Sequence, residues 1–299
     1  MSFQSDLSEI TRLMEERFGE DIIGDVIWLD KGLTNRSYKV AVKSGVFVVR
    51  LPGQGTEELI NRKDEYVSNK IACDLKIDSD LLYFDTSTGV KISAYITDAL
   101  TMSPELLRQK PNIIMAAQLL KKLHECKTDS GVDFNVPEKI NDYEAYLKKN
   151  GIGFYDDYYT KKQEILKVAD MFSKSPDAKA PCHNDPLCEN WVYGDNRMYL
   201  IDWEYAAMND PMWDVAVVSI ESSMGIDEDQ VLLSSYLGNN VTKSDMIRFL
   251  ANKVLLDFLW SLWGKTRIPV SGMEMEEYAK QRYERMVGNF DTLKRLISV

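Results

Sequence analysis

The stretch "PCHNDPLCENWVYGDNRMYLIDWE", residues 181–204, constrains the fold more than any other part of this 299-residue chain. Two apolar runs, "WVY" and "MYLID", flank "GDNR", which predicts a β-hairpin that ends at Asp202. Pro186 lies between Asp185 and Asn190, so this earlier segment is predicted to be a loop rather than a regular helix. Two carboxylates and one amide are therefore expected to converge at the open end of the hairpin.

The residues before and after this hairpin differ in pattern. From about residue 26 to 96 the chain is mostly strand-like, with strands predicted at 38–42 and 46–51 around the turn "KSG", a helix in "ELINRKDEYVSNKIAC", and a strand in "KISAYIT". Beyond about residue 97 helical spacing dominates, as in "NIIMAAQLLKKLHEC", and residues 100–111 and 128–137 are expected to be loops or connections. The order predicts an α+β fold, with a small N-terminal antiparallel-sheet lobe over residues 1–96 and a larger, mostly helical lobe over residues 97–299.

Charge and cysteine content exclude several classes of function. The chain has 47 acidic and 36 basic residues and a net charge of −11, which disfavours binding to nucleic acids or anionic membranes but tolerates a cationic small molecule. The four cysteines lack C-x-x-C spacing, and with two histidines a zinc site is not expected. Scattered cysteines, and no run of roughly 18 apolar residues, predict a cytoplasmic protein without membrane insertion.

The polar residues around the hairpin match the needs of phosphoryl transfer. One aspartate is required to accept the hydroxyl proton, while an asparagine and a second aspartate can hold Mg²⁺ through oxygen atoms. Asp185 and Asn190 stand five apart, the interval found in the catalytic loop of protein kinases, and His183 is expected to support the loop backbone. Capping of turns and of a strand end is the alternative, and it is disfavoured because the complete pattern ending in Asp202 is present.

The segments "CHNDPLCEN" and "YLIDWEYAAMNDPMWDVA" resemble the aminoglycoside phosphotransferase and choline kinase superfamily, and in particular bacterial choline kinases. The similarity extends from "KGLTNRSYKV" through "VVRLPGQGTEELINRKDE" to "LWSLWGKTR". It implies a two-lobed protein-kinase-like fold that uses ATP and Mg²⁺, with Asp185 as the catalytic base and Asn190 and Asp202 as magnesium ligands. Leu187 stands where eukaryotic relatives carry a glutamine, so contacts made by that amide are not expected here.

The resemblance also assigns a nucleotide site to the first lobe. The loop "KGLTNRS" is expected to cover the phosphates of ATP, with backbone N–H groups and short polar side chains forming the cradle. Arg50 is expected to bind the α- and β-phosphates, held by Glu65 on the following helix. The backbone at Tyr95 and Ile96 is expected to meet the adenine. The loop residues that share the phosphate-binding role are Gly32, Thr34, Asn35 and Ser37.

An aromatic group in the helical lobe indicates the acceptor. A quaternary ammonium has no N–H to donate, so its recognition relies on aromatic faces and nearby carboxylates. Packing in the core is the usual role of tryptophans at helical spacing, but the resemblance assigns a choline pocket to Trp260, Trp263, Tyr278 and Glu221. The predicted reaction is the transfer of the γ-phosphoryl group of ATP to choline.

Other acceptors and one other class of protein remain as alternatives. Ethanolamine would bring N–H donors and require more acceptors; an aminoglycoside, as a polycation, would require a wide acidic cleft, and a sugar is a further alternative. A catalytically inactive, kinase-like binding protein would be expected to lack the base or a metal ligand. Asp185, Asn190 and Asp202 are all present, which disfavours this last reading.

Overall fold

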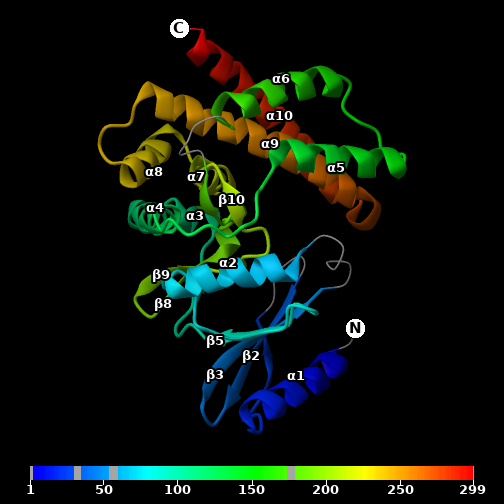
Figure 1. The fold of residues 1–299 in the computed structure, drawn as a ribbon, viewed down its shortest axis with the longest axis vertical. Coiled ribbons are helices and arrows are strands. Elements are labelled where there is room, and N and C mark those ends of the chain that lie inside the picture. Colours follow the sequence, from blue (N-terminus) through cyan, green and yellow to red (C-terminus); the bar gives the residue numbers. More distant parts are fainter. Residues whose placement is uncertain (1–2, 30–34, 54–59, 174–178, 299) are drawn as a thin grey trace. The chain divides into compact units, whose positions relative to one another are not determined.

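The computed structural model of the chain describes residues 3–29, 35–53, 60–173 and 179–298. These residues form two compact units, which Figure 1 shows as a ribbon coloured along the sequence. The first unit comprises Met1–Met102 with Glu189–Ala206, and the second comprises Ser103–Cys188 with Ala207–Val299. The first unit thus combines residues 1–102 with the polar hairpin, which follows more than eighty residues later in the chain.

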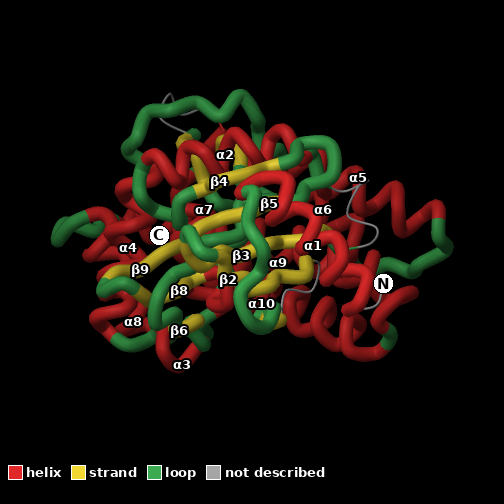
Figure 2. Tube along the Cα trace, turned by 90° about the horizontal axis from the view of Figure 1, so that it is seen from below, coloured by secondary structure: helices red, strands yellow, loops and turns green. Residues whose placement is uncertain are grey.

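An antiparallel sheet of five strands, in the order β1-β2-β3-β5-β4, forms the centre of the first unit in its described part. Figure 2 shows the strands of this sheet running side by side. Helix α1 packs Ile10 and Met14 against Val40 and Ile92 of the sheet, which gives this unit its apolar core. The bounds are α1 Phe3–Phe18, β1 Ile27–Trp28, β2 Asn35–Val42, β3 Gly45–Pro52, α2 Arg62–Asp74, β4 Leu81–Phe84 and β5 Lys91–Ala94.

Strands β2 and β3 confirm the strands predicted at residues 38–42 and 46–51. They pair without interruption from Asn35 opposite Pro52 to Val42 opposite Gly45. Alternate residues of β2 are buried, as expected for a strand with one face on a core. The same register places Ser37 directly opposite Arg50, so two of the predicted nucleotide-binding residues lie on neighbouring strands.

The polar hairpin is formed by β8 Trp191–Gly194 and β9 Arg197–Leu200. Its two turn residues, Asp195 and Asn196, both have positive φ angles, 48° and 61°, as a tight hairpin turn requires. Gly194 is required by a close approach, because a Cβ atom there would lie 2.4 Å from Cγ2 of Ile96. The hairpin predicted from "GDNR" is therefore present.

The expectation that residues 100–111 are only connections was wrong. Strand β6 Leu100–Thr101 pairs with β8, a partner about ninety residues later that no local pattern reveals. Helix α3 Pro104–Leu107 begins at Pro104 and is capped by the Ser103 side chain, and α4 starts at Lys110. Likewise, α5 starts at Val136, inside the second predicted connection, with Asn135 as its cap.

The second unit is built from helices around one apolar core. Trp213, Phe258 and Met286 are fully buried there, on three different helices. A two-stranded antiparallel sheet of β7 Ala180–Cys182 and β10 Ala207–Asn209 lies beside the start of α7. Among the described residues, no helix is both long and apolar enough to cross a membrane. The helices not bounded above are α4 Lys110–His124, α5 Val136–Lys149, α6 Tyr158–Ser173, α7 Pro211–Glu221, α8 Ile226–Leu237, α9 Lys243–Ser271 and α10 Met273–Ile297.

Candidate active site

Arg50 and Glu65 form a buried ion pair in the first unit. Nη1 of Arg50, on β3, lies 2.5 Å from Oε1 of Glu65, on α2. Arg50 also donates to the carbonyl oxygen of Gly89 at 3.0 Å and lies 3.4 Å from Oδ1 of Asp202. Burial alone would raise the pKa of Glu65, but the charge of Arg50 and its hydrogen bond lower that pKa overall. The pair therefore holds the Arg50 guanidinium next to Asp202.

A second carboxylate, Glu204, lies close to Asp202 and was not among the predicted site residues. Its side chain accepts a hydrogen bond from Nδ2 of Asn35 at 3.1 Å and lies 3.4 Å from Nη1 of Arg62. Burial, and the nearby negative charge of Asp202, raise the pKa of Glu204 to about 7. The spacing of Asp202 and Glu204 in "IDWE" could have indicated that both acidic side chains serve one site.

The hairpin brings Asn190 next to Asp202. The strand register ends with Trp191 opposite Leu200, and the backbone N–H of Ile201 donates to the carbonyl oxygen of Asn190 at 3.0 Å. Asp202 has a φ of 68°, in the left-handed region that few non-glycine residues adopt. Residues held in such conformations cluster at functional sites. Asp202 is thus placed by the hairpin rather than by local preference.

The oxygen atoms of this group fit a magnesium ion. Magnesium is bound through carboxylate and amide oxygens, which Asp202, Glu204 and Asn190 supply. Burial first, and then the negative charge of Asp202, raise the pKa of Glu204, so a nearby positive charge would compensate this carboxylate. A divalent cation would supply that compensation and would also offset the negative charge of a phosphate.

Asp185 belongs to the second unit, on a loop that is held by several hydrogen bonds. The backbone N–H of Asp185 donates to Nδ1 of His183 at 3.3 Å, which agrees with the supporting role predicted for that histidine. Asn184 has a φ of 66°, and its carbonyl oxygen accepts a hydrogen bond from Nε1 of Trp213 at 3.0 Å. Its side chain accepts from Asn209 at 2.8 Å. The residue before Asp185 is therefore held in a strained conformation from several sides.

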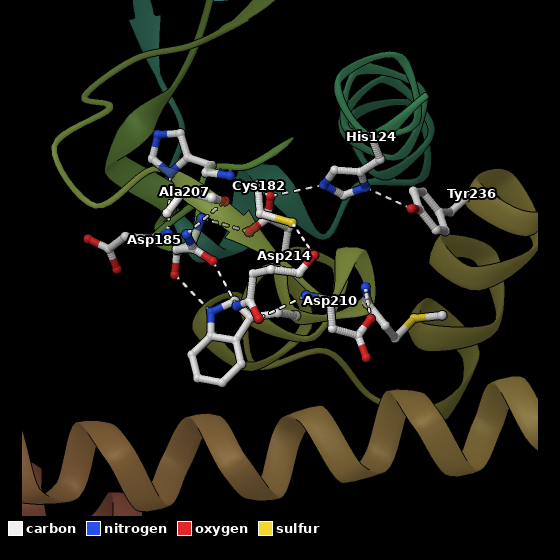
Figure 3. Close-up of polar contacts among 12 residues, drawn as sticks. His124, Cys182, Asp185, Ala207, Asp210, Asp214 and Tyr236 are labelled. Carbon is white, nitrogen blue, oxygen red and sulfur yellow. Dashed lines mark hydrogen bonds and ion pairs between the residues drawn. The ribbon is translucent and has the colours of Figure 1, made fainter. Parts of the chain in front are cut away.

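Asp214, on α7, is the anchor of this loop (Figure 3). Its two oxygens accept the backbone N–H groups of His183, at 2.7 Å, and Asn184, at 2.8 Å. His124 lies 3.1 Å from Asp214 through Nε2 and 2.7 Å from the Tyr236 hydroxyl through Nδ1. The imidazole thus continues the network, as expected for a structural histidine. The sequence did not reveal Asp214 as a loop anchor, because its partners lie thirty residues earlier.

The same network accounts for a group of potential metal ligands. Atoms of His124, Cys182 and Asp214 lie within 4.8 Å of one another and all three residues are buried. Because both oxygens of Asp214 already accept backbone N–H groups, we assign the group to loop support rather than to metal binding.

The aromatic residues predicted for the acceptor come together in the second unit. The ring centroids of Trp260 and Trp263 are 5.7 Å apart and nearly perpendicular, at 89°. Those of Trp263 and Tyr278 are 6.0 Å apart, at 72°. Trp260 is buried, whereas Trp263 and Tyr278 are only partly buried. Burial is the main cause that raises the pKa of Tyr278, with contributions from the charges of Glu221 and Asp185.

Glu221 forms an ion pair that the sequence did not reveal. Its Oε1 lies 2.6 Å from Nη2 of Arg282, on α10. The guanidinium of Arg282 also lies 4.8 Å from the ring centre of Tyr278 and 3.3 Å from Oδ1 of Asp257. Arg282 was missed from the sequence, although its position four residues after Tyr278 puts both on one helix face.

The other predicted nucleotide-binding residues have different outcomes. Gly32 and Thr34 lie outside the described residues. The N–H of Tyr95 donates to the carbonyl oxygen of Val46 at 3.1 Å, so this donor extends the sheet and is not left for a nucleotide. Ile96 packs against Val192. A cavity of about 450 Å³ in the second unit, lined by residues that include Phe134 and Trp213, contains none of the predicted site residues.

Comparison with known proteins identifies the family of this chain. The family model for choline/ethanolamine kinase matches residues 26–255. Protein LicA of Haemophilus influenzae is 28% identical over 261 residues, which cover 84% of this chain and 96% of the relative. The solved structure of choline kinase LicA from Streptococcus pneumoniae aligns with a TM-score of 0.80 at 27% identity and covers 96% of this chain and 99% of its own.

A choline/ethanolamine kinase family protein from Mesorhizobium loti aligns with a TM-score of 0.81 at 29% identity and covers 92% of both chains. These structures confirm the α+β, protein-kinase-like fold that the sequence predicted. With a fold shared along almost its whole length and a family match over most of it, the chain belongs to the choline/ethanolamine kinase family.

Proposed function

We propose that this phosphotransferase transfers the γ-phosphoryl group of ATP to the hydroxyl of choline, with Mg²⁺, and yields phosphocholine and ADP. Membership of the family makes the chain a nucleotide-using kinase of a small amino alcohol. The choice of choline, the magnesium ion, the cytoplasmic setting and the roles of individual residues are parts of the proposal.

The observation that carries the choice of choline is the group of aromatic rings at Trp260, Trp263 and Tyr278. A trimethylammonium group is attracted to such faces and gains nothing from hydrogen-bond acceptors. The named solved relative from Streptococcus pneumoniae, a choline kinase, supports the same acceptor. The three rings lie beyond the segment that the family model matches, so the choice of choline rests on the geometry of the rings themselves.

In the proposed mechanism the protein holds two reactants and moves one proton. Asp185 orients the choline hydroxyl and accepts its proton as the new P–O bond forms. Asp214 keeps the loop of Asp185 in place through its two backbone hydrogen bonds. Arg50, fixed by Glu65, stabilises negative charge on the phosphates. Asn190 and Asp202 would hold the magnesium ion, with Glu204 beside them, and the metal would neutralise phosphate charge when bound.

The experiment that tests this function measures ADP release with Mg-ATP and with choline, ethanolamine or an aminoglycoside in parallel. Turnover with choline is expected for the wild type. The Asp185→Ala and Asp185→Asn variants should lose at least roughly 100-fold in kcat, because proton transfer by a positioned side chain contributes about 10²–10⁴-fold. Phosphocholine should be identified directly by its phosphorus NMR signal.

Glu189→Gln is the matched control, since Glu189 is an exposed carboxylate four residues after Asp185. It should keep the wild-type kcat. Turnover only with ethanolamine or with the aminoglycoside would contradict choline as the acceptor while leaving the kinase reaction intact. Full activity of both Asp185 variants would contradict the proposed base.

A further inference from the structure

Arg282 joins the predicted acceptor residues to one another within the second unit. One guanidinium contacts Glu221 at 2.6 Å and Asp257 at 3.3 Å, and it lies 4.8 Å from the ring centre of Tyr278. Only 6% of the Arg282 side chain is exposed, so these contacts are formed largely away from solvent. The arginine thus pairs with the carboxylate and also stacks on the tyrosine that were predicted to bind the acceptor.

We propose that Arg282 is a positioning and specificity-determining residue of the acceptor pocket, and that it favours a quaternary over a primary ammonium by occupying Glu221. The inference rests on the proposed function, because it concerns the choice among acceptors at that site. It adds a basic residue to a pocket that was expected to hold only aromatic rings and a carboxylate.

The argument for specificity follows from what each acceptor can donate. Ethanolamine carries three N–H donors and gains most from an unpaired carboxylate, whereas the trimethylammonium of choline has no N–H and relies on aromatic faces. Because Arg282 already pairs with Glu221, this carboxylate is less able to bind a primary ammonium. Stacking of Arg282 on Tyr278 also fixes the orientation of one aromatic ring.

The local charge balance supports the same conclusion. Two carboxylates, Glu221 and Asp257, face two guanidinium groups, Arg282 and Arg285. With both pairs formed, this group carries no net charge, and the aromatic rings remain the main attraction for a cation. Loss of Arg282 alone would leave Asp257 paired through Arg285 but would release Glu221.

Arg285 provides the matched control. It contacts Asp257 twice, at 2.7 Å through Nε and through Nη2, and 40% of its side chain is exposed. Mutation of Arg285 removes the same charge from the same helix as mutation of Arg282. Arg285 is connected to the pocket through Asp257 rather than through Glu221 or Tyr278. A purely structural role in holding α10 to α9 would therefore be shared by both arginines.

The test compares kcat/KM for choline and for ethanolamine in the wild type, Arg282→Met, Arg282→Lys and Arg285→Met. The ratio of the two values should fall by at least roughly tenfold in Arg282→Met, since the released carboxylate can accept a charge-assisted hydrogen bond from a primary ammonium. The change should be mainly in KM. Arg282→Lys should give a smaller fall, because an ammonium keeps the charge but lacks the planar fork. Arg285→Met should keep the wild-type ratio.

A double variant tests whether Arg282 acts through Glu221. Replacing Glu221 by glutamine in the Arg282→Met background removes the released carboxylate and should restore much of the preference for choline. If Arg282→Met does not fold, the same comparison is made with Arg282→Lys. Its ratio of kcat/KM for choline to kcat/KM for ethanolamine is then measured with and without Glu221→Gln.

The outcomes separate this inference from the proposed function. An unchanged acceptor ratio in the Arg282 variants, or an equal loss of turnover for both acceptors, would overturn the role of Arg282 while wild-type choline kinase activity stands. If the double variant does not recover the acceptor ratio, the inference that Arg282 acts through Glu221 is overturned. A wild type that phosphorylates neither acceptor would overturn the proposed function and this inference together.

Discussion

At the scale of single residues, Asp202 combines an unusual backbone conformation with a predicted role in metal binding. Its φ of 68° is tolerated by asparagine and aspartate much better than by most other residues. Asp202→Asn should therefore keep the fold and change the unfolding midpoint by no more than about 3 °C. Activity should fall by at least roughly 100-fold, because the metal ion that Asp202 is proposed to hold would stabilise several kcal/mol of transition-state charge.

A magnesium titration of activity checks this prediction for the wild type and Asp202→Asn. The variant should need more Mg²⁺ for half-maximal rate, with ATP held constant. Asp202→Ala serves as the comparison for backbone strain, because alanine tolerates a positive φ less well than asparagine does. The alanine variant should therefore be less stable than the asparagine variant by about 1–2 kcal/mol. An unchanged magnesium requirement in Asp202→Asn would show that Asp202 is not a metal ligand.

Asp214 allows a second prediction at this scale. Its two oxygens accept backbone N–H groups from His183 and Asn184, whereas an asparagine could accept only one and would turn an NH₂ group toward the other. Asp214→Asn should lower the free energy of unfolding by roughly 1–3 kcal/mol, the cost of an unsatisfied buried donor. Because the loop of Asp185 loses its anchor, kcat should fall more than KM changes.

Urea unfolding and steady-state kinetics measure both effects. Asp210→Asn is the control, four residues earlier: it loses an ion pair with Arg248 at 2.8 Å, but asparagine still caps the helix as well as aspartate does. It should lower stability and leave kcat near the wild-type value. If Asp214→Asn proved as active as Asp210→Asn, the anchoring role would be refuted.

At the scale of elements, the sequence predicted what depends on neighbours along the chain and missed what depends on distant partners. The strands β2 and β3 and the polar hairpin were predicted because alternation and turn residues are local signals. Strand β6 was missed because it has two residues, Leu100 and Thr101, and only their pairing with β8 defines them as a strand. In the candidate site, the spacing of Asp185, Asn190 and Asp202 was visible, but the pairing of Glu221 with Arg282 joins residues sixty-one positions apart.

The contact between α5 and α6 leads to a prediction about pH. Glu144, on α5, bonds to Lys148 on its own helix and to Lys162 and Tyr158 on α6. Burial alone would raise the pKa of Glu144, but these hydrogen bonds lower it from 4.5 to about 2. A lowered pKa means that the folded state binds fewer protons, so the stabilisation is complete above about pH 4.5 and is lost as the pH falls toward 2.

Glu144→Gln should lower the free energy of unfolding at pH 7 by about 1 to 2 kcal/mol, a figure reduced from the full pKa shift because Lys148 is exposed to solvent. The difference between wild type and variant should shrink between pH 5 and pH 3, as measured by urea unfolding. Asp142→Asn, an exposed carboxylate on the same helix, should show little effect. A difference that stays constant with pH would mean that packing, and not charge, explains the effect of Glu144→Gln.

At the scale of the whole molecule, the chain passes from one unit to the other three times. It leaves the first unit after Met102, returns at Glu189 and leaves again after Ala206. The returning segment supplies Asp202 to Arg50 and Glu204 to Arg62, and the backbone of Leu200 donates to the carbonyl oxygen of Ile77. The first unit is therefore complete only when a segment from the middle of the chain has folded into it.

A fragment of residues 1–102 should for this reason fail to fold on its own. It would lack Asp202 and Glu204, which contact the buried arginines Arg50 and Arg62 in the full chain. Removing one partner of a buried ion pair costs about 3–5 kcal/mol, a large part of the 5–15 kcal/mol that stabilises a typical domain. The fragment also loses the packing of Ile96 against Val192.

Amide NMR spectra and urea titrations of the fragment and the full chain should show a dispersed spectrum and a cooperative transition only for the full chain. A fragment that unfolds cooperatively, at a midpoint close to that of the full chain, would show that the sheet and α1 suffice and that the hairpin serves catalysis rather than folding.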